Sequence, residues 1–447
     1  MEGAVKHSMK RGTLLGCLLI TLTLTTQAQR PLGRPGPLLG MEPRLDVGLY
    51  SCLVSDSVCT KFLLLGIPGN IPVLTRDEGH PGSYVARFDV DVYAFDETKS
   101  QVFHAATQRT IVSPAKGDRS HEAPPPMYIT RISLDTLPPR ARTLQLIVED
   151  RSSSRTIQHT VPLPARLSSR FSSLFVVDTS RAADRFELAS VGNVVPFGGN
   201  IRLLMQVRQG GSSLAQLSGR LTPVHPLPNA SAIPAPTLQA LGERSLSVVT
   251  GDSNVVLTPV TDPRCDAELV LLDIHSAQLE EGAYSLQLFD PDTTSPVFND
   301  TLAVHWFNKP VSLTDPQVRI EVMQYIMSAD EFKALKGASE EEQSLLLKKF
   351  WSKFSPLPFN KPLEEYYRRV DETMRRFATL RGDPGWQTDR GRVYILYGRP
   401  EEILAELPPG SAPKEIWVYP AQRKKFVFVQ TSTPGDYKLD TIESIPS

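Results

Sequence analysis

The chain has 447 residues, with 48 lysine and arginine residues against 49 aspartate and glutamate residues, so its formal net charge is −1. The length is enough for about three domains. A composition of 40% hydrophobic and 22% charged residues excludes a chain that is disordered throughout. Nucleic-acid-binding proteins usually have a clearly basic surface, so no nucleic-acid partner is expected.

The first residues have the pattern of a secretory signal peptide. Basic residues precede an apolar run from Leu14 to Leu24, and the small residues Thr26 and Ala28 occupy the −3 and −1 positions of a cleavage site. We expect cleavage after Ala28 and an exported protein, periplasmic or extracellular. The run is shorter than the roughly 20 residues that a membrane helix needs, and no later stretch is long enough. No transmembrane segment is therefore expected after the signal peptide is removed.

Strand patterns follow a Pro/Gly-rich tether over residues 29–40. Apolar and polar residues alternate between Tyr84 and Phe95 and again from Thr143 to Glu149. This period of two indicates strands with one buried face. Further short strands are predicted at residues 201–207, 269–274, 284–289 and 301–306. Short strands separated by turn residues favour β-sandwiches. We predict one sandwich over residues 41–165 and a second over residues 168–308.

An internal match suggests that the two sandwiches are copies of one module. Residues 137–146 align with residues 279–288, and the second copy reads L-x-x-G-x-Y-x-L-x-L. A glycine turn followed by Tyr284 at a strand entry is similar to the tyrosine corner of immunoglobulin-like sandwiches. Arg142 replaces the tyrosine in the first copy, so the corner is in doubt there. Convergent strand patterns are the competing explanation for so short a match.

Helical patterns begin after Lys309. Pro316 stands at the start of one helix, Ser328 with Glu331 and Ser339 with Glu342 form two capping boxes, and Pro362 opens a further helix. Strands are then predicted at residues 393–397, 415–419 and 425–430, as an antiparallel meander. The last of these is apolar on both faces, so we expect it to be central and covered by the helices. Residues 310–447 are thus predicted to form an α+β domain, the third of the chain.

The cysteines leave two interpretations open. Cys17 lies in the signal peptide, Cys265 stands alone, and Cys52 and Cys59 are close in sequence. A Cys52–Cys59 disulfide is plausible in an oxidising compartment, but spacing does not establish the geometry of a bridge. Two small buried thiols are an equal alternative.

Patterns that would indicate a particular chemistry are absent from the sequence. There is no GxSxG elbow, HExxH, P-loop, GxGxxG or CxxC motif, and the eight histidines are scattered. We therefore predict no catalytic residue, no metal and no cofactor.

The densest motif lies between the predicted helices and the meander. It contains Gly385, Trp386, Thr388, Asp389 and Arg390, followed by Tyr397 and Gly398. The pattern G-W-x-T-D-R-G-R-V-Y-I-x-Y-G-x-P-x-E-I resembles the signature of the GWxTD-domain family of bacterial exported proteins. The resemblance extends over about residues 310–440 and departs only at the proline-rich turn, residues 355–358. It implies a fold class and a bacterial envelope setting, but no activity. The motif could form a binding site or a turn that clamps the helices onto the meander.

Three functions remain open from sequence. The first is a non-enzymatic envelope protein that binds an unknown envelope partner through the C-terminal domain. The second is a hydrolase whose site includes Asp389, Arg390, Glu401 and Glu402, where two carboxylates divide acid and base roles. The third is a carbohydrate-binding sandwich, suggested only by Tyr93 and Phe95 on one strand face.

Overall fold

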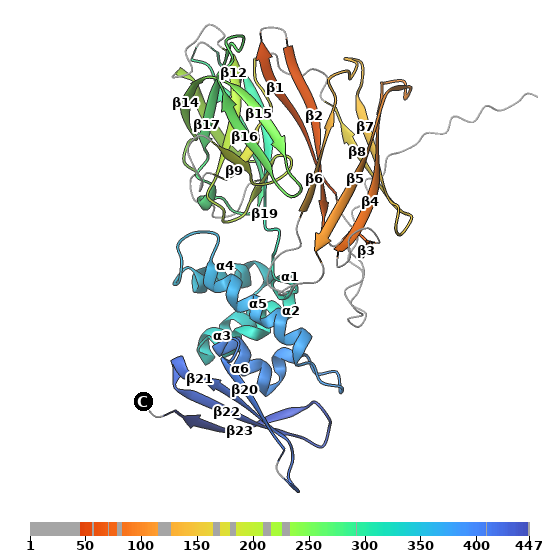
Figure 1. Cartoon of the computed structure of the whole chain (residues 1–447). Helices are drawn as coiled ribbons and strands as arrows, with labels where there is room; N and C mark the ends of the chain where they lie inside the picture. The colour runs from red at the N-terminus through yellow and green to blue at the C-terminus, as the bar shows by residue number, and fades with distance from the viewer. Residues whose placement is uncertain are drawn as a thin grey trace, which may run out of the picture. The chain divides into compact units, whose positions relative to one another are not determined.

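The structure is a computed structural model, which describes residues 45–445 apart from residues 56–57, 70, 78–82, 115–126, 164–169, 179–184, 209–215, 226–232, 292 and 408. The predicted signal peptide, its cleavage site after Ala28 and the predicted tether lie outside the described residues. Strands dominate the chain up to residue 305, and helices follow before a last small sheet (Figure 1).

The first β-module consists of two antiparallel sheets that face each other. One sheet contains β1 (Asp46–Ser55), β2 (Val58–Pro68) and β6 (Met127–Ser133). The other contains β3 (Thr75–Arg76), β4 (Ser83–Phe95), β5 (Gln101–Pro114), β7 (Thr143–Asp150) and β8 (Arg155–Pro162). Alternate residues of β4 and β7, such as Val90 and Leu146, pack against Leu63 and Leu65 of β2. The alternation that predicted these strands therefore marks the buried face.

The second β-module also has two sheets around its own apolar core. The larger sheet has the order β14-β17-β12-β9-β10-β16-β15 and the smaller sheet the order β11-β19-β18-β13. Their bounds are β9 (Phe175–Asp178), β10 (Phe186–Leu188), β11 (Val194–Pro196), β12 (Ile201–Arg208), β13 (Ser218–Pro223), β14 (Thr237–Glu243), β15 (Ser245–Thr250), β16 (Val255–Val260), β17 (Ala267–Asp273), β18 (Gly282–Phe289) and β19 (Phe298–His305). The four strands predicted in this part of the sequence are confirmed.

Strand pairing repeats between the two modules. The order β1-β2-β6 corresponds to β9-β12-β17, and β4-β7-β8 corresponds to β13-β18-β19. The aligned segments enter β7 and β18. The Tyr284 hydroxyl donates to the carbonyl of Glu280 at 2.9 Å, which is the bond of a tyrosine corner. Arg142, at the aligned position of the first module, donates through its guanidinium to the carbonyl of Pro139 at 2.9 Å.

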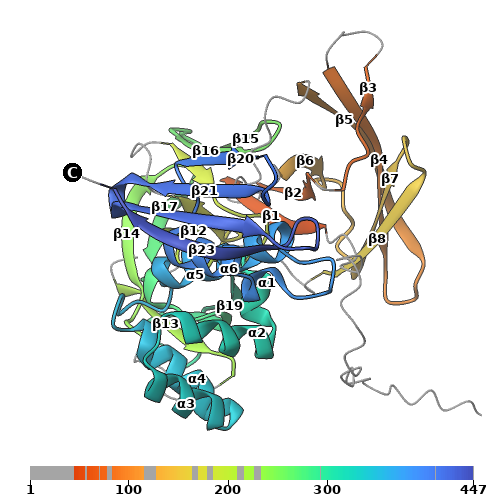
Figure 2. The same cartoon turned by 90° about the horizontal axis from the view of Figure 1, so that it is seen from below.

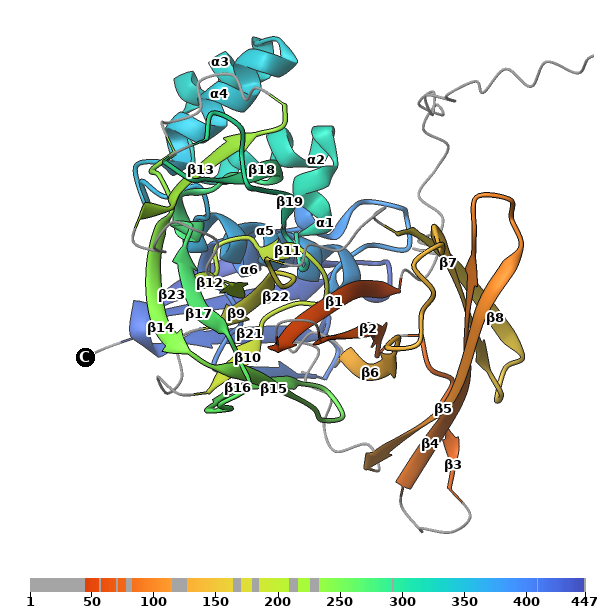
Figure 3. The same ribbon diagram turned by 90° about the horizontal axis from the view of Figure 1, so that it is seen from above.

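A third apolar core joins the modules, and no residue pattern predicted it. The outer face of the β1-β2-β6 sheet packs on the large sheet of the second module, so β1 and β2 are covered on both faces, whereas β6 contributes Ile129 and leaves Arg131 and Ser133 exposed (Figure 3). The ring of Tyr50 stacks on Phe62 and on Phe175, with centroids 5.6 and 4.9 Å apart. Double burial explains why residues 62–65 of β2 form a continuous apolar run instead of an alternating one.

The helices after Lys309 form a fourth core. They are α1 (Val311–Thr314), α2 (Pro316–Glu321), α3 (Ala329–Gly337), α4 (Glu340–Trp351), α5 (Lys361–Arg376) and α6 (Asp389–Tyr397), with the short 3₁₀ turns η3 (Val322–Tyr325) and η4 (Gly385–Gln387). Both predicted capping boxes are present, at the start of α3 and of α4. No helix in the described residues is both long and apolar enough to cross a bilayer.

A four-stranded antiparallel sheet follows, in the order β20 (Glu402–Glu406), β21 (Lys414–Tyr419), β22 (Lys424–Gln430) and β23 (Tyr437–Ser444). Helix α6 lies against one face of this sheet, where Val393 and Tyr394 pack on Trp417 and Phe428 (Figure 2). The prediction that residues 425–430 form a central strand is confirmed. The prediction of a strand at residues 393–397 is wrong, because these residues belong to α6. Thr388 caps the N-terminus of α6, and packing on the sheet stabilises the helical conformation of the β-branched and aromatic residues of α6.

Candidate functional site

The motif at residues 385–398 forms a tight turn followed by a helix. The Thr388 hydroxyl accepts from the N–H of Gly391 at 3.0 Å and donates to the carbonyl of Gly385 at 2.8 Å. A Cβ atom at Gly385 would lie 1.8 Å from the carbonyl oxygen of Thr373, and one at Gly391 would lie 1.9 Å from the carbonyl oxygen of Gly385. Both positions require glycine because backbone passes where a side chain would be.

Trp386 anchors this turn in the helical core. Its side chain is 4% exposed and packs among the helices. Its carbonyl oxygen accepts from the Tyr325 hydroxyl at 2.9 Å, which connects the turn to η3. The tryptophan therefore faces the interior of the domain and is not a surface aromatic.

The charged residues of the motif bind the sheet. An Asp389 carboxylate oxygen accepts from the N–H of Leu439 in β23 at 3.0 Å. The Arg390 guanidinium lies 4.3 Å from the ring centroid of Tyr437 and donates to the carbonyl of Gly435 at 2.6 Å and to Glu415 of β21 at 3.2 Å. Asp389 and Arg390 thus attach the first turn of α6 to two strands.

The last two motif residues close the other end of α6. Gly398 has a φ of +79°, a conformation that favours glycine, and its carbonyl accepts from the Tyr419 hydroxyl at 2.8 Å. The Tyr397 hydroxyl accepts from Lys424 at 2.9 Å. The structure therefore places all seven predicted site residues in the turn η4 and in helix α6 with its two caps, and their contacts join the helical core to the sheet. Tyr325, Glu415 and Tyr437, which complete the joint, lie within the region of the family resemblance, but no residue pattern shows that they contact the motif.

Buried tyrosine hydroxyls near the motif have the same structural role. Tyr366 donates to the carbonyl of Val322 at 2.5 Å, and Tyr367 donates to the carbonyl of Arg319 at 2.7 Å. Burial raises the pKa of both phenols. Burial, followed by the hydrogen bond to Glu372, raises the pKa of Tyr394 to about 12. These phenols stay neutral at physiological pH and act as hydrogen-bond donors inside the domain.

The structure does not assemble the hydrolase site considered from sequence. Asp389 binds β23, at one edge of the four-stranded sheet, whereas Glu402 lies in β20 at the opposite edge. The backbone of Glu401 is bonded to Val418 of β21, next to β20. Neighbouring strands are about 4.8 Å apart, so the two edges are about 14 Å apart. The four residues do not converge, because the turn after Gly398 leads the chain away from the motif.

The possible Cys52–Cys59 disulfide is not formed, and both residues are free thiols. The register pairs Cys52 with Thr60 and Leu53 with Cys59, so adjacent positions place the two thiols on opposite faces of the sheet. Cys52 is buried in the core between the modules, and burial raises its pKa to about 12. Cys59 packs beside Leu53 near Cys265, which is also a free thiol.

Tyr93 and Phe95 lie on the same face of β4, as the alternation predicts. The Tyr93 ring stacks on His104 of β5 with a centroid distance of 4.5 Å, and His104 in turn contacts Asp91 at 2.7 Å. One face of the Tyr93 ring is therefore already occupied by a neighbouring side chain. Carbohydrate binding by this sheet stays a prediction.

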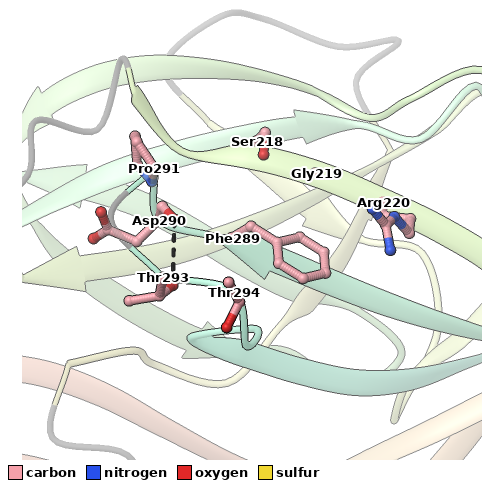
Figure 4. A pocket seen from close by; sticks show the side chains of 8 residues that line it. All are labelled: Ser218, Gly219, Arg220, Phe289, Asp290, Pro291, Thr293 and Thr294. Carbon is pink, nitrogen blue, oxygen red and sulfur yellow. Dashed lines mark hydrogen bonds between the residues drawn. The ribbon is translucent and has the colours of Figure 1, made fainter.

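Two pockets lie away from the motif. The first, of about 460 Å³, lies beside β13 and the end of β18 (Figure 4). Its carboxylate, Asp290, is 5% exposed and contacts Arg170 at 3.4 Å, and its Arg220 lies over the ring of Phe289 at 4.7 Å. The carboxylate of Asp290 and the guanidinium of Arg220 thus both have partners within the protein.

The second pocket, of about 450 Å³, lies between the second β-module and the helices. The buried rings of Tyr284, Trp351 and Tyr367 contribute to its wall. At its rim Lys348 and Glu280 form an ion pair of 2.7 Å across the junction. The pocket has the size and the mixed lining of a small-molecule site, but its described lining residues include no carboxylate pair and no histidine. Across the described residues, no group of three or more potential ligand side chains is placed to hold a metal ion.

Comparison with protein families matches residues 289–445 to the model of the GWxTD domain. The chain therefore carries a GWxTD domain, as its motif suggested. The matched region begins at the end of β18, earlier than the start predicted at about residue 310, and so includes β19 of the second β-module. No match was found among curated proteins.

Proposed function

We propose that this GWxTD-domain protein is an exported, non-enzymatic cell-envelope protein, in which the GWxTD domain docks onto an envelope partner and the β-modules act as a spacer. The observation that carries the proposal is that the motif residues make their contacts within the domain. Trp386, Asp389 and Arg390 all make their contacts inside the domain, so the family signature maintains a scaffold. A scaffold whose described residues assemble no catalytic constellation favours a role in binding.

We infer further that the β-modules are immunoglobulin-like sandwiches related by duplication. The matching strand orders, the Tyr284 corner and the Arg142 bond in the equivalent place support this relationship. The apolar core that the modules share favours a stiff spacer over two domains on a flexible linker.

Export rests on the first residues of the sequence, and it has a direct test. We expect the protein in the periplasmic or extracellular fraction, with Gln29 as its first residue. Recovery of the intact N-terminus in the cytoplasmic fraction would contradict export.

Docking can be tested with a photo-crosslinking amino acid in the full chain. Leu407 in the GWxTD domain is 79% exposed, and Val112 in the first β-module is 60% exposed, so the two positions form a matched pair. We expect a discrete crosslinked partner from envelope extract with the label at position 407 and none at position 112. Crosslinking from position 112 alone, or from neither position, would count against the GWxTD domain as the docking module.

A further inference from the structure

Strand β20 is an edge of the four-stranded sheet. It pairs with β21 on one side, and no strand in the described part of the chain pairs with its other side. All five of its residues are exposed, and Figure 2 shows it at the border of the sheet. In an antiparallel sheet, alternate residues of an edge strand direct their backbone N–H and C=O groups outward. The outer side of β20 therefore offers a row of hydrogen-bonding groups.

Apolar side chains accompany this edge. Ile403, Leu404 and Leu407 are 45%, 40% and 79% exposed. Leu404 is paired with Ile416 and continues the apolar row of the face opposite α6, whereas Ile403 is paired with Trp417 on the helix face. At the other edge, β23 exposes only Ile442 among its large apolar residues. Proteins usually protect such edges, so an exposed apolar edge is a surface onto which another strand can be added.

The charges of β20 determine which strand fits. Glu402 and Glu406 lie on the same face as Leu404, one on each side of it. In β21, Val418 is paired with Glu402 and Lys414 with Glu406, but no ion pair within 4.0 Å joins either carboxylate to a described residue. An antiparallel second copy centred on Leu404 would place Glu402 opposite Glu406, and a parallel copy in register would place each glutamate opposite itself. Like charges opposite each other are destabilising, so the edge disfavours its own copy.

We propose that β20 is a strand-addition site for an extended segment of a partner protein that has basic residues four positions apart and apolar residues between them. This proposal rests on the docking role proposed above and names the surface and the class of partner. The basic residues would face Glu402 and Glu406, the middle residue would contact Leu404, and its neighbours would contact Ile403 and Ala405. Backbone hydrogen bonds provide affinity, and the two charge pairs provide selectivity.

Synthetic peptides test the charge selectivity against the full chain without its predicted signal peptide. The probe is a fluorescent seven-residue peptide with lysine at its second and sixth positions and valine, leucine and valine between them, and its counterpart has aspartate in place of lysine. Fluorescence anisotropy should show that the lysine peptide binds about tenfold more tightly or better. Glu402→Lys with Glu406→Lys should reverse the preference. The control pair Asp440→Lys with Glu443→Lys makes the same charge change on β23 and should leave the preference unaltered.

A third peptide, with proline in place of leucine, cannot pair with the strand and should lose binding. The proposal is overturned if the proline peptide binds as well, if the control variant reverses the preference too, or if the folded wild-type chain binds neither charged peptide. It is also overturned if the wild type sediments as a dimer and the variant with Glu402→Lys and Glu406→Lys, called the β20 variant, sediments as a monomer. The β20 variant also separates the two proposals in the crosslinking experiment. If the β20 variant crosslinks to the partner as strongly as the wild type does, docking by the GWxTD domain is retained and β20 is refuted as the docking surface. If the wild type gives no crosslink, docking is refuted, and the peptide assay alone tests whether β20 accepts a strand.

Discussion

Substitution of Asp389 tests whether the motif holds the domain together. Asp389→Ala removes the carboxylate that accepts from Leu439 at 3.0 Å and an acidic group from the first turn of α6. A hydrogen bond to a charged group contributes about 1.5–3 kcal/mol, and a favourable charge at a helix N-terminus adds about 0.3–1 kcal/mol. The carboxylate is 28% exposed, so we take a total of about 2 kcal/mol. A region of this size then loses about 4–8 °C in melting temperature.

Tryptophan fluorescence is the appropriate assay for this loss. The four tryptophans are Trp306, Trp351, Trp386 and Trp417, so their emission reports on the C-terminal part of the chain. Asp389→Asn keeps an oxygen that can accept from Leu439 and should lose about half as much stability. Asp440→Ala removes an exposed carboxylate from β23 and should change the free energy of unfolding by less than about 0.5 kcal/mol. If Asp389→Ala melted within about 1 °C of wild type, the clamp would be refuted. Equal losses for the alanine and asparagine variants would assign the effect to charge alone.

Three further predictions concern the Gly385 turn, the cysteines and Glu331. Gly385→Ala should lower the free energy of unfolding by about 3 kcal/mol in the tryptophan melt, because the new Cβ would lie 1.8 Å from the carbonyl oxygen of Thr373. The control Gly337→Ala should be neutral or slightly stabilising, because no atom lies within 4 Å of its new Cβ. Alkylation of the denatured, unreduced chain without residues 1–28 should add three groups, and a single adduct would reveal a disulfide. Lys353 and the Ser328 cap lower the pKa of Glu331 from 4.5 to about 2. The stabilising effect of the Glu331 carboxylate is therefore complete above pH 4.5 and disappears as the pH falls towards 2. The melting temperatures of wild type and Glu331→Gln should converge near pH 2, and a difference that stays constant with pH would contradict this.

The sequence predicts local structure well where one residue pattern has one physical cause. Alternation along residues 84–95 marks a strand with one face buried, and the spacing of Ser328 and Glu331 marks a helix start. Prediction failed at residues 393–397, where β-branched and aromatic residues favour a strand in isolation. In the protein, the cap at Thr388 starts a helix and the sheet buries one side of it, so tertiary packing outweighs local preference.

Contacts between distant segments were beyond the sequence for a different reason. The stacking of Tyr50 on Phe175 requires the registers of β1 and β9 and the packing of two sheets, none of which leaves a periodic pattern. The partners of Asp389 and Arg390 are equally remote, since Leu439, Gly435 and Glu415 become neighbours of α6 only when the last four strands have formed. A motif and the segments that share its family resemblance can thus be located from sequence, while the contacts between them are seen only in the fold.

The distinction between a recognisable motif and a binding surface has a physical basis in this domain. A backbone carbonyl that approaches within 1.9 Å of a would-be Cβ, or a guanidinium held by a ring, a carbonyl and a carboxylate, admits very few residue types. Such positions produce a dense signature whether or not anything binds there. An edge strand imposes a weaker rule, since many sequences with charged and apolar residues in alternation can accept a complementary strand. The segment from Glu402 to Leu407 is therefore inconspicuous as a sequence, although it offers both open backbone groups and exposed apolar side chains, which the residues of the motif do not.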